Sequence, residues 1–212
     1  MTDKEKNIIR AFYRQELDLD AKSLDAIADA RALIELLLSN KCADIKSIVF
    51  EVFTPFVLEK CDVPQFSSFE DCIKVPTLIV NSGLDGISYE RMGYLLRIQK
   101  RKPVADKKYG ENHMKTAALM GLCNINKDFM TYKAYESSLT RIFSELTDEQ
   151  KLKVEPKLCL RIPLVQNYFF MGGYNKVLDD MLSILTESTK IRRRTNCNTL
   201  IEKVNHAIDY DI

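Results

Sequence analysis

The chain has 212 residues, of which 46% are hydrophobic and 29% are charged, a mixture that excludes an intrinsically disordered protein. Its 31 basic and 30 acidic residues leave a formal net charge of +1, which excludes a uniformly basic nucleic-acid coat but allows local basic patches. Seven glycines and six prolines are too few for the many tight turns of a β-sandwich or barrel. We therefore expect a mainly α, multi-helical protein.

The N-terminal region, residues 1–72, is predicted to be helical. Apolar residues recur at helical spacing in three stretches, residues 4–17, 24–38 and 44–60. Ser23 is a candidate N-cap for the second stretch. Pro55 is expected to kink or end the third, because proline lacks the amide hydrogen and clashes with the preceding turn. Residues 62–68 then read as a loop.

The middle region, residues 73–130, is predicted to form a central trihelical element. Its three short helices are expected at residues 76–82, 88–97 and 111–122. Pro76 fits the first turn of a helix, where its missing donor costs nothing, and Ser88 can cap the second helix. A basic connection of residues 98–109 joins the second helix to the third. A short hairpin is a candidate near residues 123–129.

The C-terminal region, residues 131–212, is also predicted to be helical, and all three regions could share one core. Apolar residues recur at helical spacing in residues 129–146, 174–188 and 195–208. Residues 157–162 are a candidate strand.

The middle region resembles the helix-turn-helix and winged-helix superfamily in outline. The resemblance covers residues 76–128, about a quarter of the chain, with residues 111–122 as the recognition helix and 124–128 as a much reduced wing. It implies a helix in the major groove of double-stranded DNA, a hairpin that touches the backbone, and often a homodimer. The link of about eleven residues between the second and third helices departs from the three or four of the compact motif.

Basic and polar side chains gather where this resemblance would place DNA. Six basic residues and a single acid, Asp106, occur between Arg97 and Lys108, a density suited to neutralising phosphates. The six are Arg97, Lys100, Arg101, Lys102, Lys107 and Lys108. At the start of the third helix, Asn112, His113 and Lys115 are residue types that bond base edges or phosphates. Tyr109 could pack on a sugar.

A second basic cluster precedes the C-terminal helix. It contains Lys190 and three consecutive arginines, Arg192, Arg193 and Arg194. Folded beside the first cluster, it would extend the positive surface; alone, it would be a favourable partner for a helix dipole or a solvated turn.

No catalytic constellation is recognisable. A GxxxxGK phosphate-binding loop and a GxGxxG turn are both missing. His113 and His206 have no second ligand at helical spacing, and no CxxC or CxxH pair occurs among the six cysteines. We expect a protein that is not an enzyme and holds no metal or cofactor, with free, buried thiols in a reducing compartment.

The N-terminus and the apolar runs indicate a cytoplasmic protein. The first fifteen residues are charged from Asp3 onwards and lack the apolar stretch of a signal peptide. The longest apolar runs are far too short to cross a bilayer, so no membrane partner is expected.

Three functions remain open. The first is a non-enzymatic nucleic-acid-binding or regulatory protein that uses the basic connection and the adjoining helix. The second is a helical adaptor that binds protein through apolar faces such as Phe50, Phe53 and Phe56. The third is an accessory subunit of an enzyme complex. The basic connection could equally be a solvated loop between two packing helices.

Overall fold

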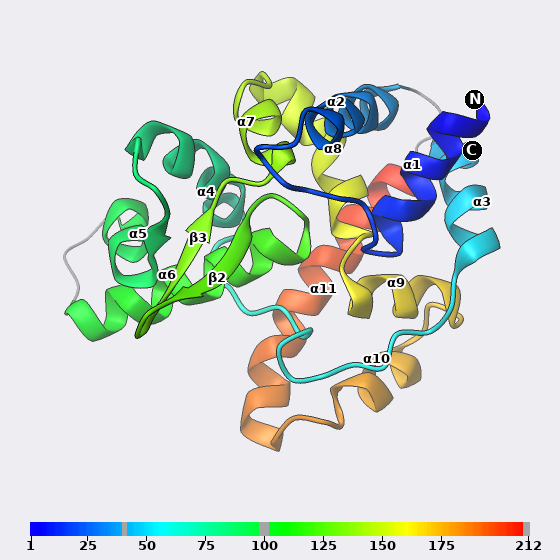
Figure 1. Cartoon of the computed structure of the whole chain (residues 1–212). Coiled ribbons are helices and arrows are strands. Elements are labelled where there is room, and N and C mark those ends of the chain that lie inside the picture. Colours follow the sequence, from blue (N-terminus) through cyan, green and yellow to red (C-terminus); the bar gives the residue numbers. More distant parts are fainter. Residues whose placement is uncertain (40–41, 98–101, 210–212) are drawn as a thin grey trace. The chain divides into compact units, whose positions relative to one another are not determined.

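The computed structural model describes residues 1–39, 42–97 and 102–209 of the chain. About 65% of the chain is helical, and the described residues form eleven helices and one small three-stranded sheet (Figure 1). The predicted mainly α, multi-helical class is confirmed. No helix within these ranges combines the length and the apolar character needed to cross a membrane.

The chain divides into two compact units that interleave along the sequence. Unit 1 comprises Met1–Asp18, Ala32–Pro64 and Asp148–Ile212, and unit 2 comprises Leu19–Arg31 and Gln65–Thr147. The sequence analysis had placed three consecutive regions at 1–72, 73–130 and 131–212. The units reflect long-range packing, since α1 (Asp3–Tyr13) packs on α3 (Cys42–Val52) and α11 (Glu187–Asp209) packs on α8 (Asp148–Cys159). Helix α2 (Leu24–Leu38) contributes residues to both units.

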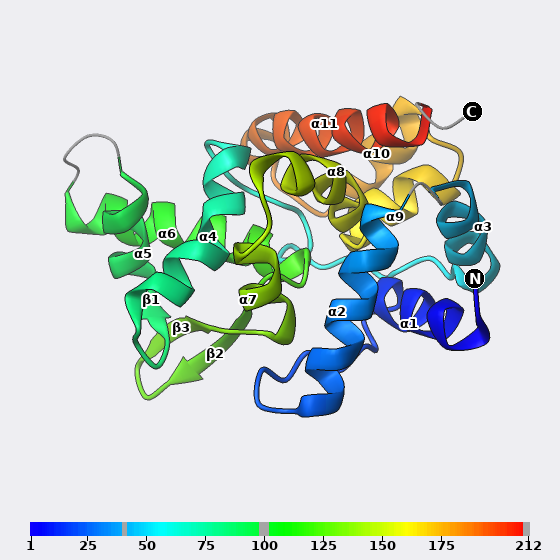
Figure 2. The ribbon, with the colours of Figure 1, turned by 90° about the horizontal axis from the view of Figure 1, so that it is seen from above.

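Unit 1 is an assembly of helices. It contains α1 (Asp3–Tyr13), α3 (Cys42–Val52), α8 (Asp148–Cys159), α9 (Pro163–Phe170), α10 (Asn175–Leu182) and α11 (Glu187–Asp209). Helix α11 runs alongside α8 (Figure 2). One apolar cluster joins α9, α10 and α11 through Leu164, Leu178 and Cys197. The predicted strand at residues 157–162 is wrong, because this run ends α8 and its residues after Lys157 are all buried, without the alternation of a half-exposed strand.

Unit 2 combines helices with the small sheet. Its elements are α4 (Phe69–Ser82), β1 (Ile87–Ser88), α5 (Tyr89–Leu96), α6 (Pro103–Leu119), β2 (Asn124–Asp128), β3 (Thr131–Tyr135) and α7 (Ser138–Ser144). The sheet is antiparallel with strand order β1-β3-β2, so β3 is central. Ile87 of β1 and Ile125 of β2 both pair with Ala134, which is fully buried.

The three predicted middle helices exist, but two of them begin earlier than expected. Helix α4 begins after Ser68, whose hydroxyl accepts a hydrogen bond from the Asp71 amide, so Pro76 lies inside the helix. Helix α6 begins at Pro103, with proline in its first turn. The predicted connection of residues 98–109 is therefore wrong in its second half, which forms the first turns of α6. The hairpin is also longer than predicted, and runs to Tyr135.

Two glycines bring α5 and α6 into backbone contact. A Cβ atom added at Gly93 of α5 would lie 1.8 Å from the Asp106 carbonyl oxygen, and one added at Gly110 of α6 would lie 1.9 Å from that of Tyr89. Only glycine fits at such distances. This contact fixes which face of α6 points to solvent.

Candidate nucleic-acid interface

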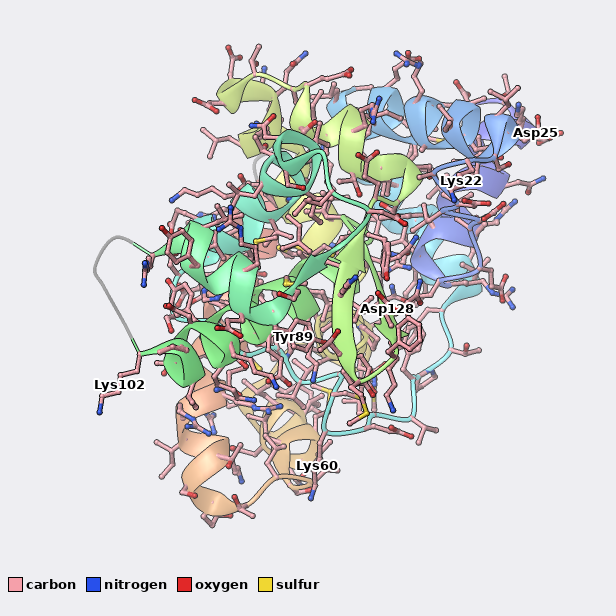
Figure 3. All side chains as sticks on the ribbon, turned by 60° about the vertical axis from the view of Figure 1, so that its left-hand side comes forward. Lys22, Asp25, Lys60, Tyr89, Lys102 and Asp128 are labelled. Carbon is pink, nitrogen blue, oxygen red and sulfur yellow. The ribbon has the colours of Figure 1, made fainter. Side chains whose placement is uncertain are left out.

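The solvent face of α6 carries lysines. Lys107, Lys108 and Lys115 are exposed, whereas Asp106, Gly110, His113, Met114, Thr116 and Ala117 form the buried face. Lys102, the N-cap residue, is also exposed and extends outward from the start of the helix (Figure 3). Lys100 and Arg101 lie outside the described residues.

Glu111 lies between two of these lysines and partly neutralises them. Its carboxylate accepts hydrogen bonds from Lys108 Nζ at 3.0 Å and Lys115 Nζ at 2.7 Å. Burial alone raises the pKa of Glu111, but the two lysines outweigh burial and lower it, so the carboxylate is ionised near neutral pH. Lys107 has no carboxylate partner within the described parts of the chain. The face keeps an excess of positive charge.

Arg97 was predicted to contact phosphate, but in the structure its side chain forms contacts within the protein. Its Nη1 donates to Asp106 Oδ2 at 3.1 Å, and its guanidinium lies 4.0 Å from the ring centroid of Tyr94. The Asp106 side chain is only 5% exposed. An opposite charge is needed to bury this carboxylate, so Arg97 ties the end of α5 to the first turn of α6.

The prediction that His113 probes a DNA groove is wrong, because the side chain is fully buried. Its Nε2 accepts the amide hydrogens of Ser67 and Ser68 at 3.3 and 3.4 Å, and its Nδ1 lies 2.6 Å from the Tyr109 carbonyl oxygen. Since a neutral imidazole donates from one nitrogen, Nδ1 is the donor. His113 therefore holds the loop before α4 against α6.

Tyr109, predicted to pack on a sugar, is also used internally. Its hydroxyl donates to Asp71 Oδ2 at 2.6 Å, and its ring lies 4.1 Å from that of His113. Burial raises the pKa of Asp71, but the hydrogen bonds from Lys74 and Tyr109 outweigh it, and the pKa is lowered overall. Of the predicted polar residues at this part of α6, Asn112 and Lys115 keep exposed surface.

The β2–β3 hairpin, which follows α6 in the chain, carries exposed residues of its own. Tyr132 of β3 stacks on Tyr89 of α5 with ring centroids 5.9 Å apart and planes within 6°. Burial raises the pKa of Tyr89 to about 12, and the charge of Glu111 adds to this effect. The Tyr89 carbonyl oxygen lies against Gly110, so the tyrosine pair borders α6. Lys127, the cross-strand partner of Tyr132, is exposed. The α6–hairpin surface comprises Lys107, Lys108, Glu111, Lys115, Lys127 and Tyr132.

The sequence analysis missed part of this surface. Lys127 was not among the predicted site residues, and Tyr132 fell in a stretch that was predicted to be helical. The available signal was the alternation of polar and apolar side chains in residues 131–135, directly after a two-residue turn. Such alternation predicts a second strand.

The second basic cluster lies inside α11, not before it, and belongs to unit 1. Arg193 Nη1 donates to the carbonyl oxygens of Lys60 and Val63 at 2.7 and 2.9 Å. Arg194 pairs with Asp179, and Lys190 Nζ lies 3.8 Å from the same carboxylate. Arg192 is exposed.

The described cysteines do not form a reactive site. Cys72, Cys123, Cys159 and Cys197 are buried and form no disulfide, and Cys61 is exposed, in contrast to the predicted burial. Burial raises the pKa of Cys123 and of Cys197 to about 12, which keeps both thiols protonated. No cluster of three or more potential metal ligands occurs among the residues that the structure describes.

Comparison of the chain with protein-family models, with curated proteins and with solved structures finds no match.

Proposed function

We propose that the protein is a non-enzymatic, regulatory DNA-binding protein in which unit 2 is a winged-helix domain. The observation that carries this proposal is the order of its elements, α4–β1–α5–α6–β2–β3, with the sheet order β1-β3-β2. This order resembles that of winged-helix domains. In that arrangement α6 is the recognition helix and the β2–β3 hairpin is the wing.

The charge on the α6–hairpin surface supports the same proposal. Lys107, Lys108 and Lys115 project from one face of α6, where a helix lying in the major groove meets both phosphate strands. Asn112 lies at the edge of this face and can bond a base edge. Lys102 and Lys127 extend the positive charge to the helix N-terminus and the hairpin.

The internal contacts give this surface a fixed shape before it meets DNA. The Arg97–Asp106 ion pair and the Gly93–Gly110 contact hold α6 against α5, and the His113 hydrogen bonds hold it against the loop before α4. A preorganised helix loses little conformational entropy on binding.

The test is fluorescence anisotropy of a labelled random duplex, titrated at several salt concentrations. We expect an affinity of about 1–100 μM that falls steeply with salt. The double variant Lys107→Ala/Lys115→Ala removes two phosphate contacts and lowers the log–log salt slope by about 0.9 for each. The matched control, Lys153→Ala/Lys176→Ala, removes two exposed lysines of unit 1 and leaves the slope unchanged. Equal slopes for both double variants would contradict the proposal.

A second candidate function is self-association or protein binding through unit 1. The structure brings Phe170 of α9 within 5.7 Å of Phe50 and 5.1 Å of Phe53, measured between ring centroids. Phe50 is 64% exposed, so this aromatic cluster keeps open apolar area. Phe56 is half-buried, and the Asn167 side chain bonds its backbone N and O. In sedimentation equilibrium, Phe50→Ser should weaken a homodimer formed through this cluster; an unaltered mass distribution would exclude it.

A further inference from the structure

The tip of the β2–β3 hairpin is apolar and exposed. Phe129 and Met130 form the two-residue turn that follows the last register pair, Asp128 and Thr131. Their side chains are 94% and 92% exposed. Hairpin turns normally carry polar residues or glycine, and two adjacent large apolar side chains in water are unfavourable.

The backbone of this turn is also unfavourable for its sequence. Phe129 has φ of 51°, in the left-handed region that glycine, asparagine and aspartate occupy readily and bulky side chains avoid. Phe129 is therefore unfavourable at this position for two reasons: its ring is exposed to water, and its backbone adopts the left-handed conformation. Strained residues of this kind occur at ligand-binding sites, so the turn is a candidate contact point.

The hairpin is braced below its tip. Lys133 pairs with Asp128 across the two strands, and Tyr132 stacks on the buried Tyr89. β3 is held between β1 and β2. A rigid support of this kind allows a protruding side chain to push against a ligand instead of folding away from it.

The surroundings of the tip favour a polyanion. The Lys133–Asp128 pair removes the nearest acid as a free charge, and Lys127 has no ion-pair partner among the described residues. The tip continues the α6–hairpin surface, whose lysines are placed for phosphates. Side chains such as Phe and Met enter the minor groove of DNA in several architectural proteins, where they partly unstack a base step and kink the duplex.

We propose that Phe129 and Met130 form a wedge that enters the minor groove and bends the DNA bound by unit 2. This inference rests on the proposed DNA-binding function and adds to it. Contacts of a hairpin with the backbone alone need polar or basic residues at the tip, whereas these two side chains offer no group that bonds phosphate. The ligand is therefore a duplex whose bases can be partly unstacked.

The test separates bending from binding. A duplex of about 25 base pairs, labelled at both ends, reports bending by energy transfer, and anisotropy of the same duplex reports binding. The full chain should raise the transfer efficiency on saturation.

Phe129→Asn removes the ring and suits the left-handed backbone, so the hairpin is retained. This variant should bind within about threefold of the unaltered protein and lose most of the transfer change. Val57→Asn, which removes a 95% exposed apolar side chain of unit 1, is the matched control and should bend DNA normally.

The outcomes distinguish a failure of the wedge from a failure of the DNA-binding function. Salt-dependent binding without any transfer change, or with the same change in Phe129→Asn, overturns the wedge and leaves the DNA-binding function intact. No binding by the unaltered chain at low salt overturns both. Sedimentation with vesicles of phosphatidylcholine and phosphatidylglycerol, lost in Phe129→Asn but not in Val57→Asn, assigns the tip to a lipid surface and overturns the wedge.

Discussion

The two basic clusters of the chain look alike in sequence and differ in what their cations contact. In unit 1, Arg193 bonds two backbone carbonyls and Arg194 pairs with Asp179, so the cluster in α11 stabilises the fold of that unit. In unit 2, Lys102 and Lys107 of the first cluster point to solvent with no carboxylate partner in the described residues. A run of basic residues stays available to an external anion only at the positions where the fold supplies no acceptor.

The difference lies in the neighbouring elements. The α11 arginines face the chain segment of residues 60–63, whose carbonyls are not used in a helix or strand, and a carboxylate on α10. Such acceptors bind guanidinium groups well, because a guanidinium has five N–H donors and can bond several oxygen atoms at the same time. Among the residues that the structure describes, the outer face of α6 instead meets only the carboxylate of its own Glu111. Variants in both regions can contradict or refine this contrast.

The largest effect is expected from Gly110→Ala, which disrupts the α5–α6 backbone contact that orients α6. The added Cβ would lie 1.9 Å from the Tyr89 carbonyl oxygen, and backbone cannot yield as a flexible side chain does. We expect a loss of about 3 kcal/mol or more in the free energy of unfolding, together with loss of DNA binding. Urea denaturation followed by circular dichroism measures the first quantity.

Gly83→Ala is the control for that experiment. Gly83 also lies in unit 2 and has φ of 60°, but an added Cβ there meets no atom within 4 Å. Only backbone strain remains, which costs about 1 kcal/mol. Equal losses in the two variants would show that the α5–α6 contact tolerates a methyl group, and that the orientation of α6 does not depend on it.

A smaller effect is expected from Arg193→Ala, which tests the structural role of the α11 cluster. The variant loses two charge-assisted hydrogen bonds to the carbonyls of Lys60 and Val63, worth about 2–3 kcal/mol in total. Its neighbour Arg192 is exposed, and Arg192→Ala should change stability by less than about 0.5 kcal/mol. Thermal unfolding of the two variants gives the comparison. A weaker salt slope for DNA in folded Arg193→Ala would instead place this cluster at the DNA.

Much of the fold could be predicted from local signals. Ser88 caps α5 as expected, with its hydroxyl accepting from the Arg91 amide, and the loop at residues 62–68 ends where α4 begins. The start of α6 could not be found from apolar spacing, because its first two turns pack on α5 through Asp106 and Gly110 instead of large apolar residues. Pro103 was the signal for that helix start.

The site was predictable in composition but not in side-chain direction. Lys107, Lys108 and Lys115 are exposed as a DNA-contacting role requires, whereas Tyr109 and His113, on the same helix, point inward. Their partners, Asp71 and the amides of Ser67 and Ser68, lie 38 to 46 residues earlier in the chain. Helical spacing cannot reveal contacts at such separations, since they depend on how α4 packs against α6.

The third-largest effect is expected from Glu111→Gln, which sharpens the contrast by removing the one acid among the residues that define the α6–hairpin surface. Lys108 and Lys115 lose their carboxylate partner and become available to phosphate, so DNA affinity should rise about threefold to tenfold at low salt. Glu149→Gln is the matched control, because Glu149 also pairs with a lysine four residues later but belongs to unit 1. Anisotropy titrations should show less than about a twofold change for the control. Unchanged affinity in Glu111→Gln would mean that α6 does not face the phosphates.

The smallest effect is a pH dependence of unit 2 that originates from Asp71. Its pKa lies below the ordinary 3.8, because the hydrogen bonds from Lys74 and Tyr109 outweigh the effect of burial. Since the folded-state pKa is lowered, the ionised carboxylate stabilises the fold above about pH 4, and this contribution is lost as the pH falls through the lowered pKa. Urea midpoints measured between pH 5.5 and pH 3, about the range in which carboxylates titrate, should therefore fall more steeply for the unaltered protein than for Asp71→Asn. Tyr109→Phe, which removes one of the two hydrogen bonds, should give an intermediate slope. Parallel pH profiles for all three proteins would show that Asp71 does not hold Tyr109, and with it the inner face of α6, in place.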